Sequence, residues 1–165
     1  MDGKLDAAGD RWRIRFERRL DHPPERVWRA ITEPEHLAAW FPQRIIGPWK
    51  LGARLRFESE YGDFEGEVLA FEPMRLLEFR WGTDVIRLEV VKDGAGSILT
   101  LVDTITELGK AARDAAGWHE CLDRLEADLA GEKPRDWGER STQLRDGYAE
   151  RFGPEAATIG PPPKP

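Results

Sequence analysis

The feature that most constrains the fold is a change of hydrophobic period near Gly109. Before it, over residues 44–106, apolar side chains alternate with polar ones in short segments, and turn sequences such as YGD (61–63), EPMR (72–75) and KDGAGS (92–97) separate these segments. A period of two is typical of strands with one buried face, and tight turns between such strands predict an antiparallel meander. After Gly109 the apolar residues follow a helical period. The chain therefore predicts a run of hairpins followed by one long helix.

One face of this long helix is apolar. At about 100° per residue, a single stripe contains Ala111, Ala115, Trp118, Leu122, Leu125 and Leu129. Gly131 and Pro134 are typical of the end of a helix. A sheet with one wet face must bury its other face, and this is the only predicted helix large enough to cover it.

An alternating segment, RWRIRFERRL (11–20), predicts the first strand. Pro23 and Pro24 stop that strand and suit the first turn of a helix. Pro34 then divides residues 21–41 into two short helices. The resulting fold class is α+β, with two short helices between the first and second strands.

The chain divides into three segments. Residues 1–10 are expected to be a flexible N-terminus, and residues 11–131 form one domain. The extension 132–165 ends in the proline-rich GPPPKP, which is expected to be disordered. Within the extension, one further short amphipathic helix is compatible with the spacing of Trp137, Leu144, Tyr148 and Phe152.

Charge and composition exclude several classes of function. The net charge of −6 argues against nucleic acid or an anionic membrane as a main partner, because both need a basic field. The longest apolar run, LAAWF (37–41), is too short to span a membrane, and no signal peptide is recognisable, so a cytoplasmic location is expected. One cysteine and three dispersed histidines show no metal-binding spacing, and no nucleotide-binding or hydrolase motif is present. No cofactor is expected.

Several stretches resemble one known family. HPPERVWRAITEPEHLAAWF, GARLRF, FEGEVLAFEPMRLLEFRW and GWHECLDRLEADL are similar to bacterial proteins related to the activator of heat-shock ATPase, within the START-like, polyketide-cyclase and birch-allergen (SRPBCC) superfamily. The resemblance implies a helix-grip fold, in which a curved seven-stranded antiparallel sheet grips the C-terminal helix around a hydrophobic cavity. It does not imply one function, since members bind lipids, cyclise polyketides, carry hormones or stimulate a chaperone ATPase.

The same resemblance argues against a chaperone partner. The eukaryotic activator has an additional N-terminal domain that contributes much of its effect, whereas only about ten residues precede the first strand expected here.

Large side chains on the expected inner faces are candidates to line such a cavity. They are Trp40, Phe57, Phe64, Phe79 and Trp81 from the sheet and the second short helix, with Trp118 and Leu122 from the long helix. The alternative is that the same rings simply form the core.

Four polar or reactive residues need a separate interpretation. Arg18 and Asp103 share parity with apolar strand positions, so each either reaches water near a strand end or serves as a polar group in the cavity. His119 is either a boundary histidine oriented by Asp123 or a polar group at the cavity wall. Positions i and i+2 of a helix do not face each other, so a catalytic Cys121–His119 pair is excluded. Cys121 is expected to be a small core-edge residue, because free cysteine behaves as a buried apolar residue.

Three functions follow. The first is binding of a small apolar or amphipathic molecule. The second is an enzyme acting on a polyketide-like or aromatic compound, with His119 or Asp103 as general acid or base. The third is a protein-interaction module, such as a chaperone ATPase regulator or a partner of a transcriptional repressor, which would use the C-terminal extension. A homodimer is a further possibility.

Overall fold

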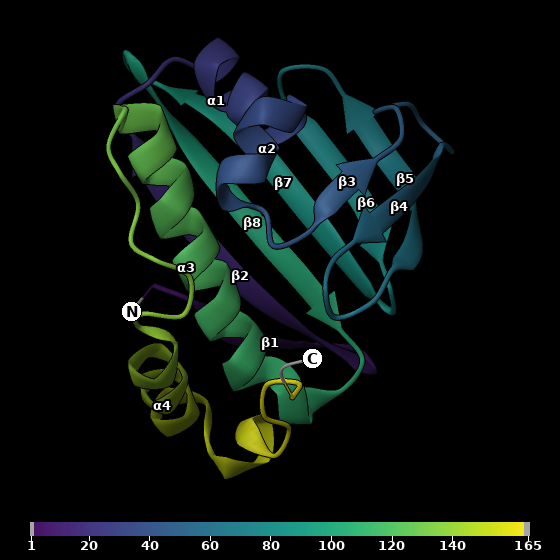
Figure 1. Cartoon of the computed structure of the whole chain (residues 1–165), viewed down its shortest axis with the longest axis vertical. Helices are drawn as coiled ribbons and strands as arrows, with labels where there is room; N and C mark the ends of the chain where they lie inside the picture. The colour runs from purple at the N-terminus through teal and green to yellow at the C-terminus, as the bar shows by residue number, and fades with distance from the viewer. Residues whose placement is uncertain (1, 164–165) are drawn as a thin grey trace.

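Alternating side chains build one antiparallel sheet, which curves around a long helix in the computed structural model of residues 2–163 (Figure 1). The strand order is β1-β2-β8-β7-β6-β5-β4-β3. The strands are β1 (Lys4–Ala8), β2 (Arg11–Leu20), β3 (Arg44–Ile46), β4 (Arg54–Glu58), β5 (Phe64–Glu72), β6 (Leu76–Trp81), β7 (Asp84–Asp93) and β8 (Gly96–Ile105). All strand neighbours are antiparallel, as the meander of hairpins predicted.

The helices are α1 (Pro24–Thr32), α2 (Pro34–Trp40), α3 (Ala111–Ala130) and α4 (Ser141–Phe152), with 3-10 turns η1 (Leu108–Lys110) and η2 (Pro154–Ala157). Helices α1, α2 and α3 cover the concave face of the sheet, and α4 packs on α3 (Figure 1). Every residue of the predicted apolar stripe of α3 is buried, and the helix ends at Gly131, whose φ of 69° is left-handed. None of the described helices is long and apolar enough to cross a membrane.

The sheet has eight strands rather than the seven expected, because residues 4–8 add one strand at its edge. They form β1, which pairs with β2 from Lys4↔Arg15 to Ala8↔Arg11 across a two-residue turn. Leu5 packs against the core, but five residues with one large apolar side chain give too little alternation to be recognised. The two short helices consequently lie between the second and third strands.

The C-terminal extension folds back onto the domain. Helix α4 packs on α3, and it buries Leu144 and Tyr148 there. The hydroxyl of Tyr148 accepts the Gly3 backbone N–H at 3.1 Å, which joins the two ends of the chain. The last two residues of the proline-rich end, which was expected to be disordered, lie outside the described residues.

Candidate ligand cavity

A cluster of aromatic rings packs between the sheet and α3. Phe57 stacks on Phe64 with ring centroids 5.2 Å apart and on Phe79 at 5.8 Å. Trp81 and Trp118 lie 5.2 Å apart at the end of this cluster. Ring–ring contacts of this kind stabilise a core beyond the effect of burial alone, so the main role of these strand aromatics is to pack against one another.

Trp40 is part of this interior. Its side chain is fully buried, and its indole N–H donates to the Ala30 carbonyl at 2.8 Å, which ties α2 to α1. Leu122 is also buried, on the face of α3 that meets the sheet.

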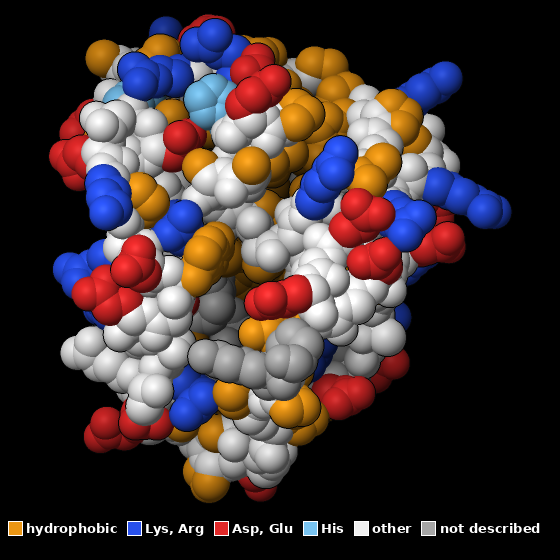
Figure 2. Space-filling view, in the orientation of Figure 1, with side chains coloured by type: hydrophobic (Ala, Val, Ile, Leu, Met, Phe, Trp, Pro, Cys, Tyr) orange, Lys and Arg blue, Asp and Glu red, His pale blue; other side chains and the backbone are white. Residues whose placement is uncertain are grey.

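A cavity of about 470 Å³ remains where this aromatic cluster meets the C-terminal extension. Trp81 and Trp118 form its inner wall, and Trp137 belongs to its outer wall. The other lining residues are Pro42, Gln43, Tyr61, Arg113, Asp114, Ala116, Gly117, Glu120, Cys121, Ser141, Arg145, Pro161 and Pro162. The face of the molecule in Figure 2 is hollowed, and hydrophobic side chains line the hollow.

An exposed glycine in the middle of α3, Gly117, borders the open side of this space. A Cβ added at Gly117 would meet no atom within 4 Å, so no neighbouring side chain fills the position. Glycine inside a helix costs about 1 kcal/mol relative to alanine. Gly117 therefore gives up helix stability at the position where the helix borders the cavity.

Most polar groups of the lining already have partners within the protein. The Trp81 indole donates to Oε1 of Gln43 at 3.0 Å, and Nε of Arg113 donates to Oδ1 of Asp114 at 2.8 Å. A carboxylate oxygen of Glu120 accepts the backbone N–H of Gly138. The first contact joins the loop after α2 to β6, the second lies within α3, and the third joins α3 to the C-terminal extension.

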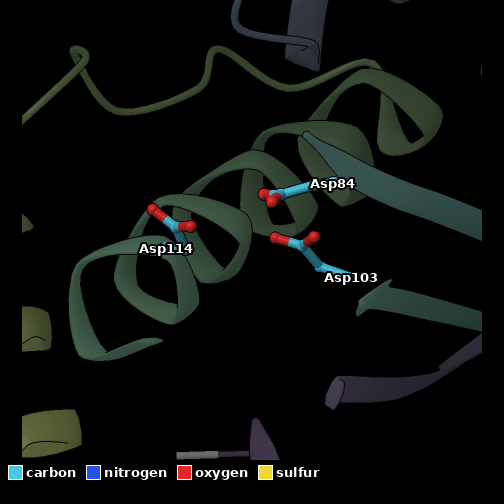
Figure 3. Close-up of side chains that lie close together, drawn as sticks. All are labelled: Asp84, Asp103 and Asp114. Atoms are coloured by element: carbon cyan, nitrogen blue, oxygen red, sulfur yellow. The ribbon is translucent and has the colours of Figure 1, made fainter. Parts of the chain in front are cut away.

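Beside the cavity lies a cluster of three carboxylates, of which only Asp114 lines the cavity itself. One oxygen from each of Asp84, Asp103 and Asp114 falls within 4.8 Å of the others, and Asp84 and Asp103 are 1% and 0% exposed. Figure 3 shows the carboxylates of Asp84 and Asp103 directed toward each other, with Asp114 beside them on α3. Nζ of Lys110 donates to both oxygens of Asp84, at 2.7 and 2.8 Å. These are residues that could together hold a metal ion, and the ammonium group of Lys110 already acts as their counter-ion.

Asp103 is the member of this cluster that keeps a proton most readily. Burial raises its pKa well above the ordinary value, the negative charges of Asp84 and Asp114 raise it further, and a hydrogen bond from Trp118 opposes the shift. That bond joins Nε1 of Trp118 to Oδ2 of Asp103 at 2.9 Å, while Oδ1 has no partner in the described chain. A protonated Oδ1 would donate to Asp84 and satisfy both groups. Asp103 therefore positions an aromatic residue of the cavity wall without lining the cavity.

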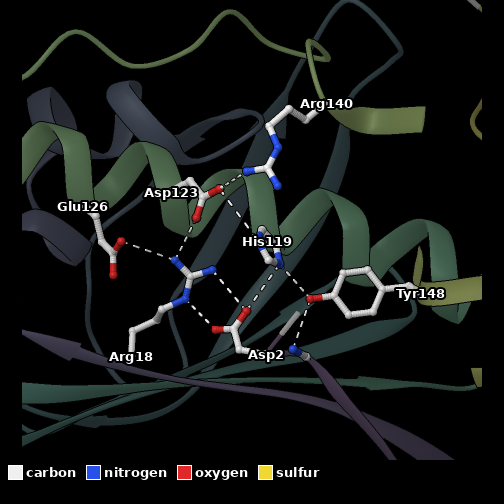
Figure 4. A network of polar contacts seen from close by, with 8 residues as sticks. Asp2, Arg18, His119, Asp123, Glu126, Arg140 and Tyr148 are labelled. Carbon is white, nitrogen blue, oxygen red and sulfur yellow. Dashed lines mark hydrogen bonds and ion pairs between the residues drawn. The ribbon is translucent and has the colours of Figure 1, made fainter. Parts of the chain in front are cut away.

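His119 and Arg18 lie at the opposite edge of α3. The Arg18 side chain is 12% exposed and contacts Asp2 at 2.6 Å, Asp123 at 2.8 Å and Glu126 at 3.5 Å (Figure 4). Nδ1 of His119 lies 2.7 Å from the Tyr148 hydroxyl. This network fastens β1, β2, α3 and α4 together.

The protonation of His119 agrees with that structural role. Burial lowers its pKa, and Asp123 only partly opposes the effect. A neutral ring can accept the Tyr148 O–H at Nδ1, while the same hydroxyl accepts the Gly3 N–H. Neither His119 nor Arg18 lines the cavity.

Cys121 lies on the cavity side of α3 and His119 on the opposite edge, as the helical geometry predicted. Its side chain is buried, and burial raises the pKa of its thiol. A buried neutral thiol packs as a small apolar group.

The structure thus brings together only part of the predicted set. The cavity is lined by two of them, Trp81 and Trp118. The packed interior contains Trp40, Phe57, Phe79 and Leu122. Phe64 borders a shallow groove beside Asp84 and Lys110. Sequence reasoning missed Gln43, Gly117 and Arg145. Of these, Gly117 had a recognisable signal, because a glycine interrupts an otherwise helical pattern.

Comparisons with known proteins agree with this fold. Residues 21–130 match the family model described as Activator of Hsp90 ATPase homolog 1-like protein. A conserved protein of unknown function from Enterococcus faecalis, EF2215, has a TM-score of 0.76 at 21% identity, over 91% of this chain and 90% of that protein.

Two further solved structures are similar. CalU16 from Micromonospora echinospora has a TM-score of 0.75 at 22% identity, over 94% of both chains. DynU16, described as a protein in the dynemicin biosynthetic locus, has a TM-score of 0.66 at 28% identity, over 74% of this chain and 48% of that one. No curated protein sequence matches the chain.

Proposed function

The chain belongs to the family of Activator of Hsp90 ATPase homolog 1-like proteins, and from that premise we propose that it binds a small hydrophobic or amphipathic molecule in the cavity beside Gly117. The observation that carries the proposal is the 470 Å³ space between the indoles of Trp81 and Trp118 and the C-terminal extension. Ligand sites in proteins are usually preformed clefts of about this size, with apolar walls and a few polar groups.

The chemistry of the walls supports an aromatic ligand. Trp81, Trp118 and Trp137 line the space, and a planar ring system would pack against the parts of these indoles that border it. One face of Trp137 is already covered by the Arg124 guanidinium, 4.1 Å from the ring centroid. Among the similar structures, DynU16 is a protein of a biosynthetic locus, and such a setting is compatible with a small organic ligand. Affinity would come mainly from apolar area removed from water.

The catalytic alternative has less support. His119 contacts Tyr148 on the far edge of α3, and Asp103 lies behind Trp118, so the two residues do not face a common space. The interaction-module alternative also has less support, because α4 buries Leu144 and Tyr148 against its own α3.

Filling the space at Gly117 tests the proposal. N-phenyl-1-naphthylamine is an uncharged aromatic probe whose fluorescence rises in an apolar site. The Gly117→Leu side chain would project into the cavity, so we expect it to abolish probe binding, measured by fluorescence titration of the full chain. The matched Gly117→Ala variant should bind the probe with little change, because one methyl group occupies little of the space.

Stability separates blocking from unfolding. Both substitutions replace a helical glycine, so we expect each to keep or raise the free energy of unfolding, by up to about 1 kcal/mol. A folded Gly117→Leu protein that binds the probe as well as the wild type would contradict the proposed site.

A further inference from the structure

We infer that the ligand of this cavity carries an anionic group, a carboxylate or sulfonate on an aromatic skeleton, which Arg145 binds. The inference rests on the proposed function and adds the class of ligand. The polar groups of the lining fall into two sets, those that already bind another group of the protein and those that do not.

The charges at the start of α3 are used within the protein. Arg113 donates to Asp114 at 2.8 Å and to the Gly160 carbonyl at 3.3 Å. Asp114 also lies 3.5 Å from Lys110. These groups neutralise one another, so they leave no net charge for a ligand to meet on this side of the cavity.

Arg145 is different. It lies on α4, it is half-buried, and within residues 2–163 no carboxylate or carbonyl group forms an ion pair or hydrogen bond with it. A guanidinium group presents several donors in a planar fork that matches a carboxylate or sulfonate. Withdrawing such a group partly from water without a partner is unfavourable, and a bound anion would reverse that penalty.

The side-chain amide of Gln43 is a second hydrogen-bond donor that an anionic ligand could use. Oε1 of Gln43 accepts the Trp81 indole N–H, so the NH₂ of this amide is the part that stays free for a ligand. The lining carboxylate that would oppose an anion is Glu120. One of its oxygens accepts the Gly138 backbone N–H, so this carboxylate is already used in holding the C-terminal extension on α3.

A matched pair of probes tests the inference. 8-Anilinonaphthalene-1-sulfonate has the same ring system as N-phenyl-1-naphthylamine and carries one additional sulfonate group. Arg145→Gln should weaken the binding of the sulfonate probe about tenfold, the size expected for one charge-assisted hydrogen bond, and leave the uncharged probe unaffected. Arg145→Lys should retain part of the sulfonate affinity, because it keeps the charge and loses the fork.

A control variant separates a local effect from net charge. Arg19→Gln removes one positive charge from an exposed position on β2 outside the cavity lining, and it should change neither affinity. Equal weakening of both probes by Arg145→Gln, or no effect on the sulfonate probe, would overturn the inference. Wild-type protein that binds the uncharged probe and not the sulfonate would also overturn it. Failure of the wild type to bind either probe would instead remove the proposed function and the inference with it.

Discussion

Asp103 is a fully buried carboxyl group whose partners come from three different elements. Parity along the last strand predicted that it shares a face with Leu99 and Leu101, and the structure confirms that this face is the buried one. The alternative in which Asp103 reaches water near a strand end is wrong, because the side chain is 0% exposed. The hairpin at 92–97 accounts for Asp84, because it pairs β7 with β8 beside Asp103. The position of Lys110 could not be predicted, since nothing in the local pattern brings η1 to this point.

The raised pKa of Asp103 predicts a dependence of stability on pH. The folded pKa lies above the ordinary value of 3.8, so within that interval the folded state binds more protons than the unfolded state. The free energy of unfolding should therefore fall as pH rises from the unfolded pKa through the folded one. In Asp103→Asn, the amide can still accept the Trp118 N–H and donate to Asp84 but cannot lose a proton. We therefore expect this variant to lose less free energy of unfolding than the wild type as pH rises. Urea unfolding at a series of pH values measures the difference.

An exposed carboxylate supplies the control for that experiment. Asp146→Asn, on the exposed side of α4, should leave the pH dependence as it is in the wild type. If Asp103→Asn and the wild type lost stability in parallel over the whole pH range, Asp103 would not hold the proton assigned to it.

The C-terminal extension is the element that completes the cavity. Its helix α4 was anticipated from the spacing of Trp137, Leu144, Tyr148 and Phe152, although the helix begins at Ser141 and does not include Trp137. The path of the residues beyond α4 was not anticipated. The backbone N–H of Ile159 donates to the Gly109 carbonyl at 3.0 Å, and this contact directs Pro161 and Pro162 to the cavity. Periodicity describes a helix, but a single hydrogen bond between distant loops leaves no pattern in the sequence.

Removing residues 158–165 should open the cavity without unfolding the protein. The removed residues of the described chain are exposed, and Ala156, which is buried, is kept. We expect weaker binding of N-phenyl-1-naphthylamine, by roughly five- to tenfold, because the proline wall contributes apolar contact. Stopped-flow fluorescence should show faster dissociation of the probe.

Urea unfolding of the truncated protein should give nearly the wild-type midpoint. Probe affinity and dissociation rate equal to those of the full chain would mean that the tail is not a wall of the site.

At the scale of the whole molecule, the sequence predicted the architecture better than the site. The change of period at Gly109 is enough to predict an antiparallel meander and one long helix, because each period is set by the geometry of its own element. The curvature of the sheet was implied by the family resemblance. The predicted lining aromatics were assigned by face alone. Facing the interior does not separate Phe57 and Phe79, which stack on each other, from Trp81 and Trp118, which border open space. That distinction depends on how all the elements pack.

The central claim is that a ligand occupies the space between Trp81, Trp118 and the C-terminal extension. The most direct measurement is a crystal structure of the full chain in complex with 8-anilinonaphthalene-1-sulfonate. We predict the naphthalene ring beside Gly117 against the two indoles, with the sulfonate toward Arg145. A probe bound elsewhere on the protein, with this space closed by side chains, would contradict the claim.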